Sequence, residues 1–338
     1  MANKGNFNEN TRVQIPGALH LVRLGYKYLS NIQDEEYDHS TNILKDVFYR
    51  SIARLNPSMS DTEIKNFFGE VVRMCRDNED LGREFYNLLT ASTGTKIIDF
   101  ENPSNNEWHV TTEFTCENER TTDNFRPDIT IFVNGMPLVF IEVKKPNNYQ
   151  GILVERSRID TRMRNRAFKS FFNITQFMIF SNNEEYNEDT VVPISGAFYC
   201  TTSKDKAFFS TFREEDRELL LKVGYKYEVP EDIEKEILLH RNCPQLKALP
   251  EYKTNQEPST PTNRIMTSML SKERLLFILR YGIAYVEKKK KIEKDGKEEE
   301  ITELQKHIMR YQQLFATYAI RASLDKGVKG GIIWHTQG

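Results

Sequence analysis

The sequence predicts an α/β protein in which helices flank a mixed β-sheet, and three observations carry this prediction. Segments 18–29, 41–55 and 61–75 have apolar residues at helical spacing. Runs rich in Ile, Val, Phe and Thr then predict strands at 95–100, 108–115, 129–133, 138–143, 174–181 and 196–201. Asn134-Gly135, between two of these runs, is a strong hairpin signal. A long helix is predicted over 151–170, between the strands at 138–143 and 174–181.

Length and composition narrow the class of protein. A chain of 338 residues with 38% apolar residues is long enough for two domains with real cores. A net charge of -2 excludes a globally basic DNA-coating protein but leaves room for a local basic groove. Four cysteines without a CxxC pair indicate a reduced, cytoplasmic setting. No apolar stretch approaches the roughly 20 residues that span a bilayer, so we expect no membrane segment.

The chain divides into three predicted parts. Residues 251–264 are polar and contain two prolines, which is typical of a linker. We therefore expect one domain over 1–250 and the start of a second over 265–338. The second part is predicted to be helical at 265–285 and 302–324, with a charge run between them, and to end in a short strand at 330–338.

Asp128, Glu142 and Lys144 are the candidate catalytic residues. Glu142 and Lys144 lie two apart in a strand, so they share one face, and Asp128 opens the partner strand of the same hairpin. Hard carboxylate oxygens suit Mg²⁺, which keeps several waters and accepts phosphate oxygens as further ligands. The lysine can orient or deprotonate the attacking water or neutralise the phosphate. The predicted metal ligands are Asp128, Glu142 and the backbone carbonyl of Val143.

A structural alternative exists for the same residues. A Lys–Glu pair at the rim of a sheet, with Asp128 capping a turn, needs no catalytic role. The preceding proline, the hairpin, the apolar flanks and the helix that follows favour a nuclease instead. On these features alone the two interpretations stay open.

The sequence of the hairpin also resembles a known family. Asp128 with Glu142-Val143-Lys144 resembles the PD-(D/E)xK nuclease pattern. RPDITIFVNGMPLVFIEVKKP resembles the nuclease domain of the type I restriction enzyme R (restriction/motor) subunit, and the similarity continues in order through ITQFMIFSNN, LLFILRYGIAYVE, HIMRYQQLFATYAI and GGIIWHTQG. The resemblance implies a restriction-endonuclease-like mixed sheet, followed by the helical start of a RecA-like motor domain. It implies Asp128 and Glu142 as Mg²⁺ ligands and Lys144 as the catalytic lysine.

The predicted helix after the lysine departs from the family. Many members carry Gln-x-x-x-Tyr there, and this sequence has no such pair between 151 and 170. Instead, the segment 151–170 contains six basic residues and only two acidic ones. Arg158, Arg162 and Arg166 recur every four residues and are predicted to stack on one helical face. A solvated basic face is the plain interpretation; beside a nuclease site, we expect phosphate contacts by Arg156, Arg158, Arg162 and Arg166.

The last residues resemble the start of an ATP site. In the family, HTQG is followed by Gly-Lys-Ser/Thr, which completes a phosphate-binding loop. The sequence stops at Gly338, before any lysine, so we expect a fragment of a longer protein that binds ATP only when complete. Gln313 resembles a glutamine that motor ATPases place near adenine. Gln313 and Gly338 are therefore the candidate ATP-binding residues.

The expected function is Mg²⁺-dependent cleavage of double-stranded DNA, within a complex that also contains methyltransferase and specificity subunits. Two rival interpretations stay open. One is a DNA-clamping or docking module that no longer cuts, which the intact Asp128, Glu142 and Lys144 disfavour. The other is a different PD-(D/E)xK enzyme, such as a repair nuclease or junction resolvase, which the motor-like residues 265–338 disfavour.

Overall fold

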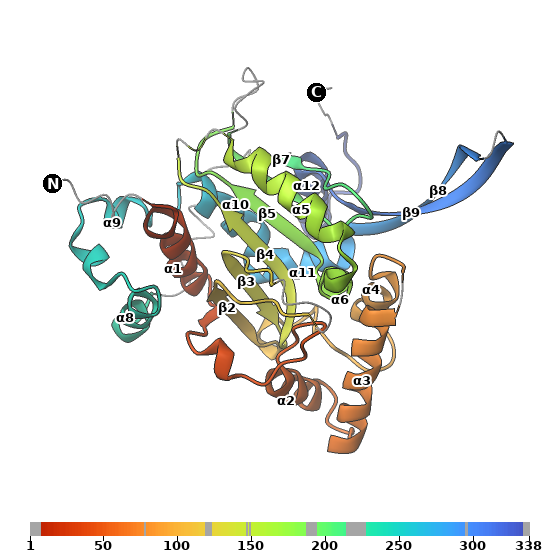
Figure 1. Cartoon of the computed structure of the whole chain (residues 1–338), viewed down its shortest axis with the longest axis horizontal. Coiled ribbons are helices and arrows are strands. Elements are labelled where there is room, and N and C mark those ends of the chain that lie inside the picture. Colours follow the sequence, from red (N-terminus) through yellow and green to blue (C-terminus); the bar gives the residue numbers. More distant parts are fainter. Residues whose placement is uncertain are drawn as a thin grey trace.

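A seven-stranded mixed sheet forms the centre of the molecule (Figure 1). The computed structural model describes residues 8–77, 79–118, 124–146, 148, 150–186, 195–213, 228–294 and 297–333. The strands lie side by side in sequence order: β1 (Lys27–Tyr28), β2 (Trp108–Thr112), β3 (Ile129–Val133), β4 (Met136–Val143), β5 (Phe177–Ser181), β6 (Ala197–Cys200) and β7 (Ser210–Phe212). β1–β2 and β4–β5 are parallel pairs, and the other neighbours are antiparallel. The predicted mixed α/β sheet is confirmed.

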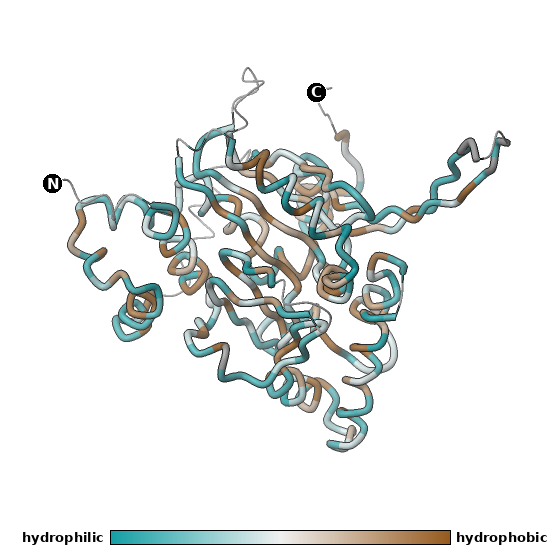
Figure 2. The backbone as a smooth tube through the Cα atoms, in the orientation of Figure 1, coloured by the Kyte–Doolittle hydropathy of each residue, from teal (hydrophilic) through white to brown (hydrophobic). Residues whose placement is uncertain are grey.

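Helices cover both faces of the sheet. On one face, α1 (Ile15–Arg23), α10 (Pro261–Leu270) and α11 (Lys272–Tyr281) join a hydrophobic cluster with Ile141 and Val143 of β4. On the other face, α5 (Gly151–Arg164) and α6 (Lys169–Ile174) pack with Phe140. The remaining helices are α2 (Lys45–Leu55), α3 (Asp61–Asp77), α4 (Arg83–Leu89), α8 (Glu231–His240), α9 (Glu251–Thr254) and α12 (Tyr311–Asp325). Figure 2 shows the hydrophobic stretches concentrated along the central strands and the helix sides that face them.

The β3–β4 hairpin is built as the sequence predicts. Asn134 and Gly135 have φ values of 50° and 82°, the left-handed region that a tight two-residue turn requires. A Cβ on Gly135 would lie 2.6 Å from the carbonyl oxygen of Leu44, so this turn also needs glycine for close packing. Every residue of β4 is buried, which makes it a central strand. The turn therefore sets the register that brings the start of β3 beside the end of β4.

One predicted strand is wrong, and one predicted helix is correct in place but too long. Residues 95–100 form no strand, because side chains hold this segment as a loop: the Asp99 carboxylate accepts the backbone N–H groups of Glu101 and Asn102. The predicted helix over 151–170 ends at Arg164. Asn165 begins a new turn there, with its side-chain oxygen accepting the N–H of Ala167.

The charge run after α11 forms strands, and the helix expected over 302–324 is correct only in its second half. β8 (Ile283–Lys294) and β9 (Lys297–Ile308) pair over their whole length as a projecting antiparallel ribbon (Figure 1). Lysines on β8 face glutamates on β9, as in the Lys289–Glu300 ion pair of 2.7 Å. Cross-strand charge pairs thus replace the apolar alternation that predicts strands. Residues 331–333 form no strand, and 334–338 lie outside the described residues.

The predicted linker contains helical structure. Residues 251–264 form α9 and the first turn of α10, and Tyr252, Thr262 and Asn263 are buried. The helices that follow pack into the same core as α1 and the sheet. The division of the chain into 1–250, 251–264 and 265–338 stays a prediction. None of the helices among the described residues is both long and apolar enough to cross a membrane.

Candidate active site

Asp128, Glu142 and Lys144 come together where β3 begins and β4 ends. Ile129 pairs with Ile141 in this antiparallel hairpin. Asp128, just before Ile129, and Glu142, just after Ile141, therefore lie side by side. An oxygen of the Asp128 carboxylate accepts the backbone N–H of Val143 at 2.8 Å, which fixes the aspartate against β4. Ile141 and Val143 enter the opposite hydrophobic cluster, so Glu142 and Lys144 point toward α5. The face that the sequence predicts for the acid and the lysine is confirmed.

The backbone of Asp128 is held by residues far away in the sequence. Its carbonyl oxygen accepts hydrogen bonds from the side chain of Gln14 (2.8 Å) and the backbone N–H of Glu113 (3.0 Å). Arg241, directly after α8, donates to the side chains of Gln14, Glu113 and Asn10. One arginine thus ties the N-terminal segment to the start of β3.

Lys144 lies in a cage of oxygen atoms. Its ammonium donates to the backbone carbonyl of Val143 at 2.8 Å and to the Glu9 carboxylate at 3.1 Å. Carboxylate oxygens of Glu155 and Asp128 lie 3.5 and 3.8 Å away. The lysine is therefore bound by groups from the N-terminal segment, the hairpin and α5.

Burial and mutual repulsion set the electrostatics of the acids. Burial, with the nearby charges of Asp128 and Glu155, raises the pKa of Glu142 well above its usual range. Burial also raises the pKa of Asp128. For Lys144, burial alone would lower the pKa, but the surrounding carboxylates outweigh it and raise the pKa. A bound divalent cation would favour the ionised form of both acids.

The donor atoms present fit a magnesium ion that takes water and phosphate for most of its ligands. No three His, Cys, Asp or Glu side chains in the described part of the chain form a cluster that could hold a metal. Asp128, Glu142 and the Val143 carbonyl supply hard oxygens of the kind that Mg²⁺ prefers. One oxygen of Glu142, Oε1, is buried and has no hydrogen-bond partner, so it is available as a metal ligand. The Val143 carbonyl already accepts from Lys144.

Contrary to the prediction, Arg158, Arg162 and Arg166 do not line up on one face of a single helix. Arg166 lies beyond the end of α5. Arg158 is 58% exposed and donates to Glu155 at 2.5 Å. Arg162 is only 27% exposed and turns inward, with its Nη1 3.7 Å from Glu142 Oε1. Arg156 lies near the ring of Phe209. The expected stacking on one face fails because the helix ends at Arg164 and its arginines have different partners.

Glu9, Glu155 and Arg241 are site residues that the sequence reasoning missed. Glu155 had a signal: with Ile152 and Ile159 it occupies the buried stripe of α5, an unusual place for an acid. Glu9 and Arg241 had none, because only the folded chain brings them near the hairpin.

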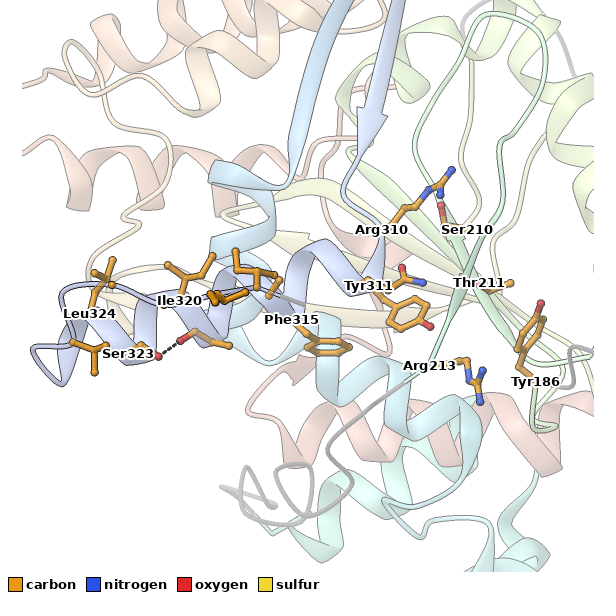
Figure 3. Close-up of a pocket in the computed structure, with 18 of the residues that line it drawn as sticks. Tyr186, Ser210, Thr211, Arg213, Arg310, Tyr311, Phe315, Ile320, Ser323 and Leu324 are labelled. Carbon is orange, nitrogen blue, oxygen red and sulfur yellow. Dashed lines mark hydrogen bonds between the residues drawn. The ribbon is translucent and has the colours of Figure 1, made fainter. Parts of the chain in front are cut away.

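The candidate ATP-binding residues stay predictions. The side-chain oxygen of Gln313 accepts the backbone N–H of Arg310 and caps the start of α12. Gly338 lies outside the described residues. A groove of about 1410 Å³ runs beside α12, β7 and residues 328–333, and Figure 3 shows Tyr311, Phe315 and Arg213 among the side chains that line it.

Comparisons with known proteins identify the family. The family described as "Type I restriction enzyme R protein N terminus" matches residues 6–187. The chain is 24% identical, over 98% of its length, to a protein of Methanocaldococcus jannaschii named as the type I restriction enzyme MjaIXP endonuclease subunit. It is 28% identical over 72% of its length to the MjaVIIP endonuclease subunit of that organism.

The matched relatives are much longer than this chain. The chain spans 30% of the first relative and 18% of the second. The family match itself covers the N-terminal segment, the β3–β4 hairpin and α5, which are the parts that build the site described above. The chain therefore belongs to the family of type I restriction enzyme R protein N termini.

Proposed function

We propose that this chain supplies the nuclease site of a type I restriction enzyme and hydrolyses double-stranded DNA with the help of Mg²⁺. The observation that carries the proposal is the meeting of Asp128, Glu142 and Lys144 at one end of a buried hairpin, with an unpartnered carboxylate oxygen. Burying so many charges costs several kcal/mol unless they are paired or bind a ligand. A purely structural pair at a sheet rim needs no such cluster.

Each residue has a distinct role in the proposed reaction. Asp128, Glu142 and the carbonyl of Val143 would hold the ion. When bound, Mg²⁺ supplies Lewis acidity and lowers the pKa of a bound water. Lys144, which its raised pKa keeps as an ammonium, orients the attacking water or neutralises charge at the phosphate, and its cage of carboxylates keeps it in place. Arg156, Arg158 and Arg166 contact backbone phosphates, which position a duplex without reading its sequence.

The rest of the proposed activity belongs to the longer protein. We propose that the complete subunit binds ATP, through a site that includes Gln313 and Gly338, and works in the cytoplasm with methyltransferase and specificity subunits. The family membership and the partial coverage of its relatives support this assignment.

One observation favours the rival interpretation, a DNA-docking module that does not cut. The Lys144 ammonium lies on the Val143 carbonyl, so an ion that uses this carbonyl must displace the lysine. Metal binding therefore decides between the two.

The test is calorimetry with Mn²⁺. Wild type should bind Mn²⁺ weakly in the absence of DNA, and Asp128→Ala and Glu142→Gln should abolish the heat; Asp205→Asn, at an exposed loop position, is the matched control. Because the pKa of Glu142 is raised, protons compete with the metal, so the affinity should be higher at pH 8 than at pH 6. Equal heats from wild type and Asp128→Ala would remove Asp128 from the site, and no heat from wild type would favour the docking module.

A further inference from the structure

We propose that Arg162 contacts the reacting phosphate beside Glu142, in contrast to its neighbours on α5, which at most follow the outer backbone of the duplex. This assignment rests on the proposed nuclease function and adds a substrate-binding residue to it. Three features of the structure support it: a fixed guanidinium, an unpartnered donor atom and the charge balance of the site.

The guanidinium of Arg162 is held against an aromatic surface. Its central carbon lies 4.0 Å from the centre of the Phe125 ring. Phe125 is fully buried and packs against Phe140 and Phe171 from β4 and α6. An arginine stacked in this way is already ordered, so little side-chain entropy is lost when it binds a ligand.

The end of Arg162 carries an unused donor. Its Nη1 atom is buried and has no hydrogen-bond partner, and the same is true of Glu142 Oε1, 3.7 Å away. That distance is too long for a direct hydrogen bond. Leaving a buried charged donor unsatisfied costs about 1–3 kcal/mol or more, which a ligand atom would recover. Arg162 Nη1 and Glu142 Oε1 are therefore placed so that one further group could bind between them.

The other two cations at the site are already engaged. Lys144 donates to the Val143 carbonyl and to Glu9 and is flanked by Glu155. Arg158 donates to the buried carboxylate of Glu155. Within the described residues of this cluster, Arg162 is thus the cation whose buried donor atom has no acceptor.

The charge balance fits a metal ion together with one phosphodiester. Four carboxylates and three cationic side chains gather here, those of Glu9, Asp128, Glu142, Glu155, Lys144, Arg158 and Arg162. With all seven side chains ionised, as a bound divalent cation favours, one negative charge is left over. A divalent cation would turn it into one positive charge, and the single negative charge of a phosphodiester would then neutralise the site.

The experiment separately measures binding of Mn²⁺ and binding of the dinucleotide thymidylyl-(3′→5′)-thymidine, whose single phosphodiester carries one negative charge. With saturating Mn²⁺, Arg162→Gln should weaken binding of the dinucleotide about tenfold to a hundredfold, as expected for a lost hydrogen bond between charged groups. Affinity for Mn²⁺ itself should stay equal or increase, because a positive charge next to Glu142 is gone. Arg164→Gln, an exposed arginine on the same helix, is the control and should change neither.

The outcomes separate this assignment from the proposed function. If Arg162→Gln lowers Mn²⁺ affinity and leaves dinucleotide affinity unchanged, the arginine only holds Glu142 and the assignment is wrong; it is also wrong if neither affinity changes. A wild type that binds no Mn²⁺ overturns the nuclease function and the assignment together. Arg162→Lys retains the charge without the planar group and should show a smaller loss than Gln. Thermal melting identifies a variant that fails to fold, and the lysine variant then decides.

Discussion

Two buried lysines of this protein have opposite surroundings. Lys144, after β4, is 8% exposed, and Lys306, in β9, is 5% exposed. Lys144 has three carboxylates within 4 Å. Lys306 has no ion pair among the described residues; it donates to the carbonyl of Thr175 at 3.3 Å and lies 5.6 Å from the ring of Tyr285. Equal burial therefore does not mean equal electrostatics.

The surroundings shift the pKa values of the two lysines in opposite directions. Burial lowers the pKa of Lys306 to about 7, and the charges of Cys75 and Asp80 offset only part of this shift. The carboxylates around Lys144 outweigh its burial and raise its pKa. A lysine that stays charged inside a protein marks a site prepared for negative charge, whereas Lys306 is a cation that the ribbon buries at a cost.

The largest expected difference between them is in DNA cleavage. Lys144→Met should reduce cleavage by about a hundredfold to ten-thousandfold, the range for loss of a group that transfers or orients a proton. Lys306→Met should leave the rate within about twofold, because the side chain donates to the carbonyl of Thr175 and has no ion pair with a site residue in the part of the chain that the structure describes. The measurement is nicking of supercoiled DNA by the complex with the proposed methyltransferase and specificity subunits. An equal loss in a folded Lys306→Met variant would contradict the comparison.

The next effect is on the pH dependence of stability. Because the folded pKa of Lys306 lies below its unfolded value, the unfolded chain binds more protons between pH 7 and 10, and the free energy of unfolding should rise with pH. Lys306→Met should be more stable at pH 7, by roughly a few kcal/mol, and lose part of this rise. Lys144 adds nothing to the rise, since its raised pKa gives stability that is fully present below pH 10. Urea denaturation at pH 7 and 9 measures both; parallel curves for wild type and Lys306→Met would disprove the assignment.

The smallest expected effect separates the carboxylates that surround Lys144. Glu155 is almost fully buried between Lys144 and Arg158, and Glu9 is 33% exposed. Glu155→Gln should lower the free energy of unfolding by about 1–3 kcal/mol, because Lys144 and Arg158 lose a buried negative charge and keep only a neutral acceptor. Glu9→Gln should cost less than about 1 kcal/mol, since water screens the pair. Urea denaturation at pH 7 compares them, and a larger cost for Glu9→Gln would show that the N-terminal segment dominates the cage.

Local patterns predicted the core of the site. Asn134-Gly135 specifies a tight turn, and the period-two alternation of a strand places Glu142 and Lys144 on one face. Both features depend on residues close together in the chain, so the hairpin and the face that carries the candidate site could be predicted from the sequence. The same local reasoning failed at β8 and β9, because cross-strand ion pairs such as Lys289–Glu300 stabilise a ribbon that has little apolar alternation.

The sequence by itself determined the mixed sheet and the hairpin and singled out Asp128, Glu142 and Lys144 as candidate site residues, because short-range backbone preferences and side-chain periodicity specify these features. Only the tertiary structure decided which charges accompany them. Glu9 and Glu155 reach Lys144 from two other segments, and Arg162 turns inward because Phe125 offers it a surface. These contacts join residues far apart in sequence, and their energies depend on burial and distance, which no local pattern records.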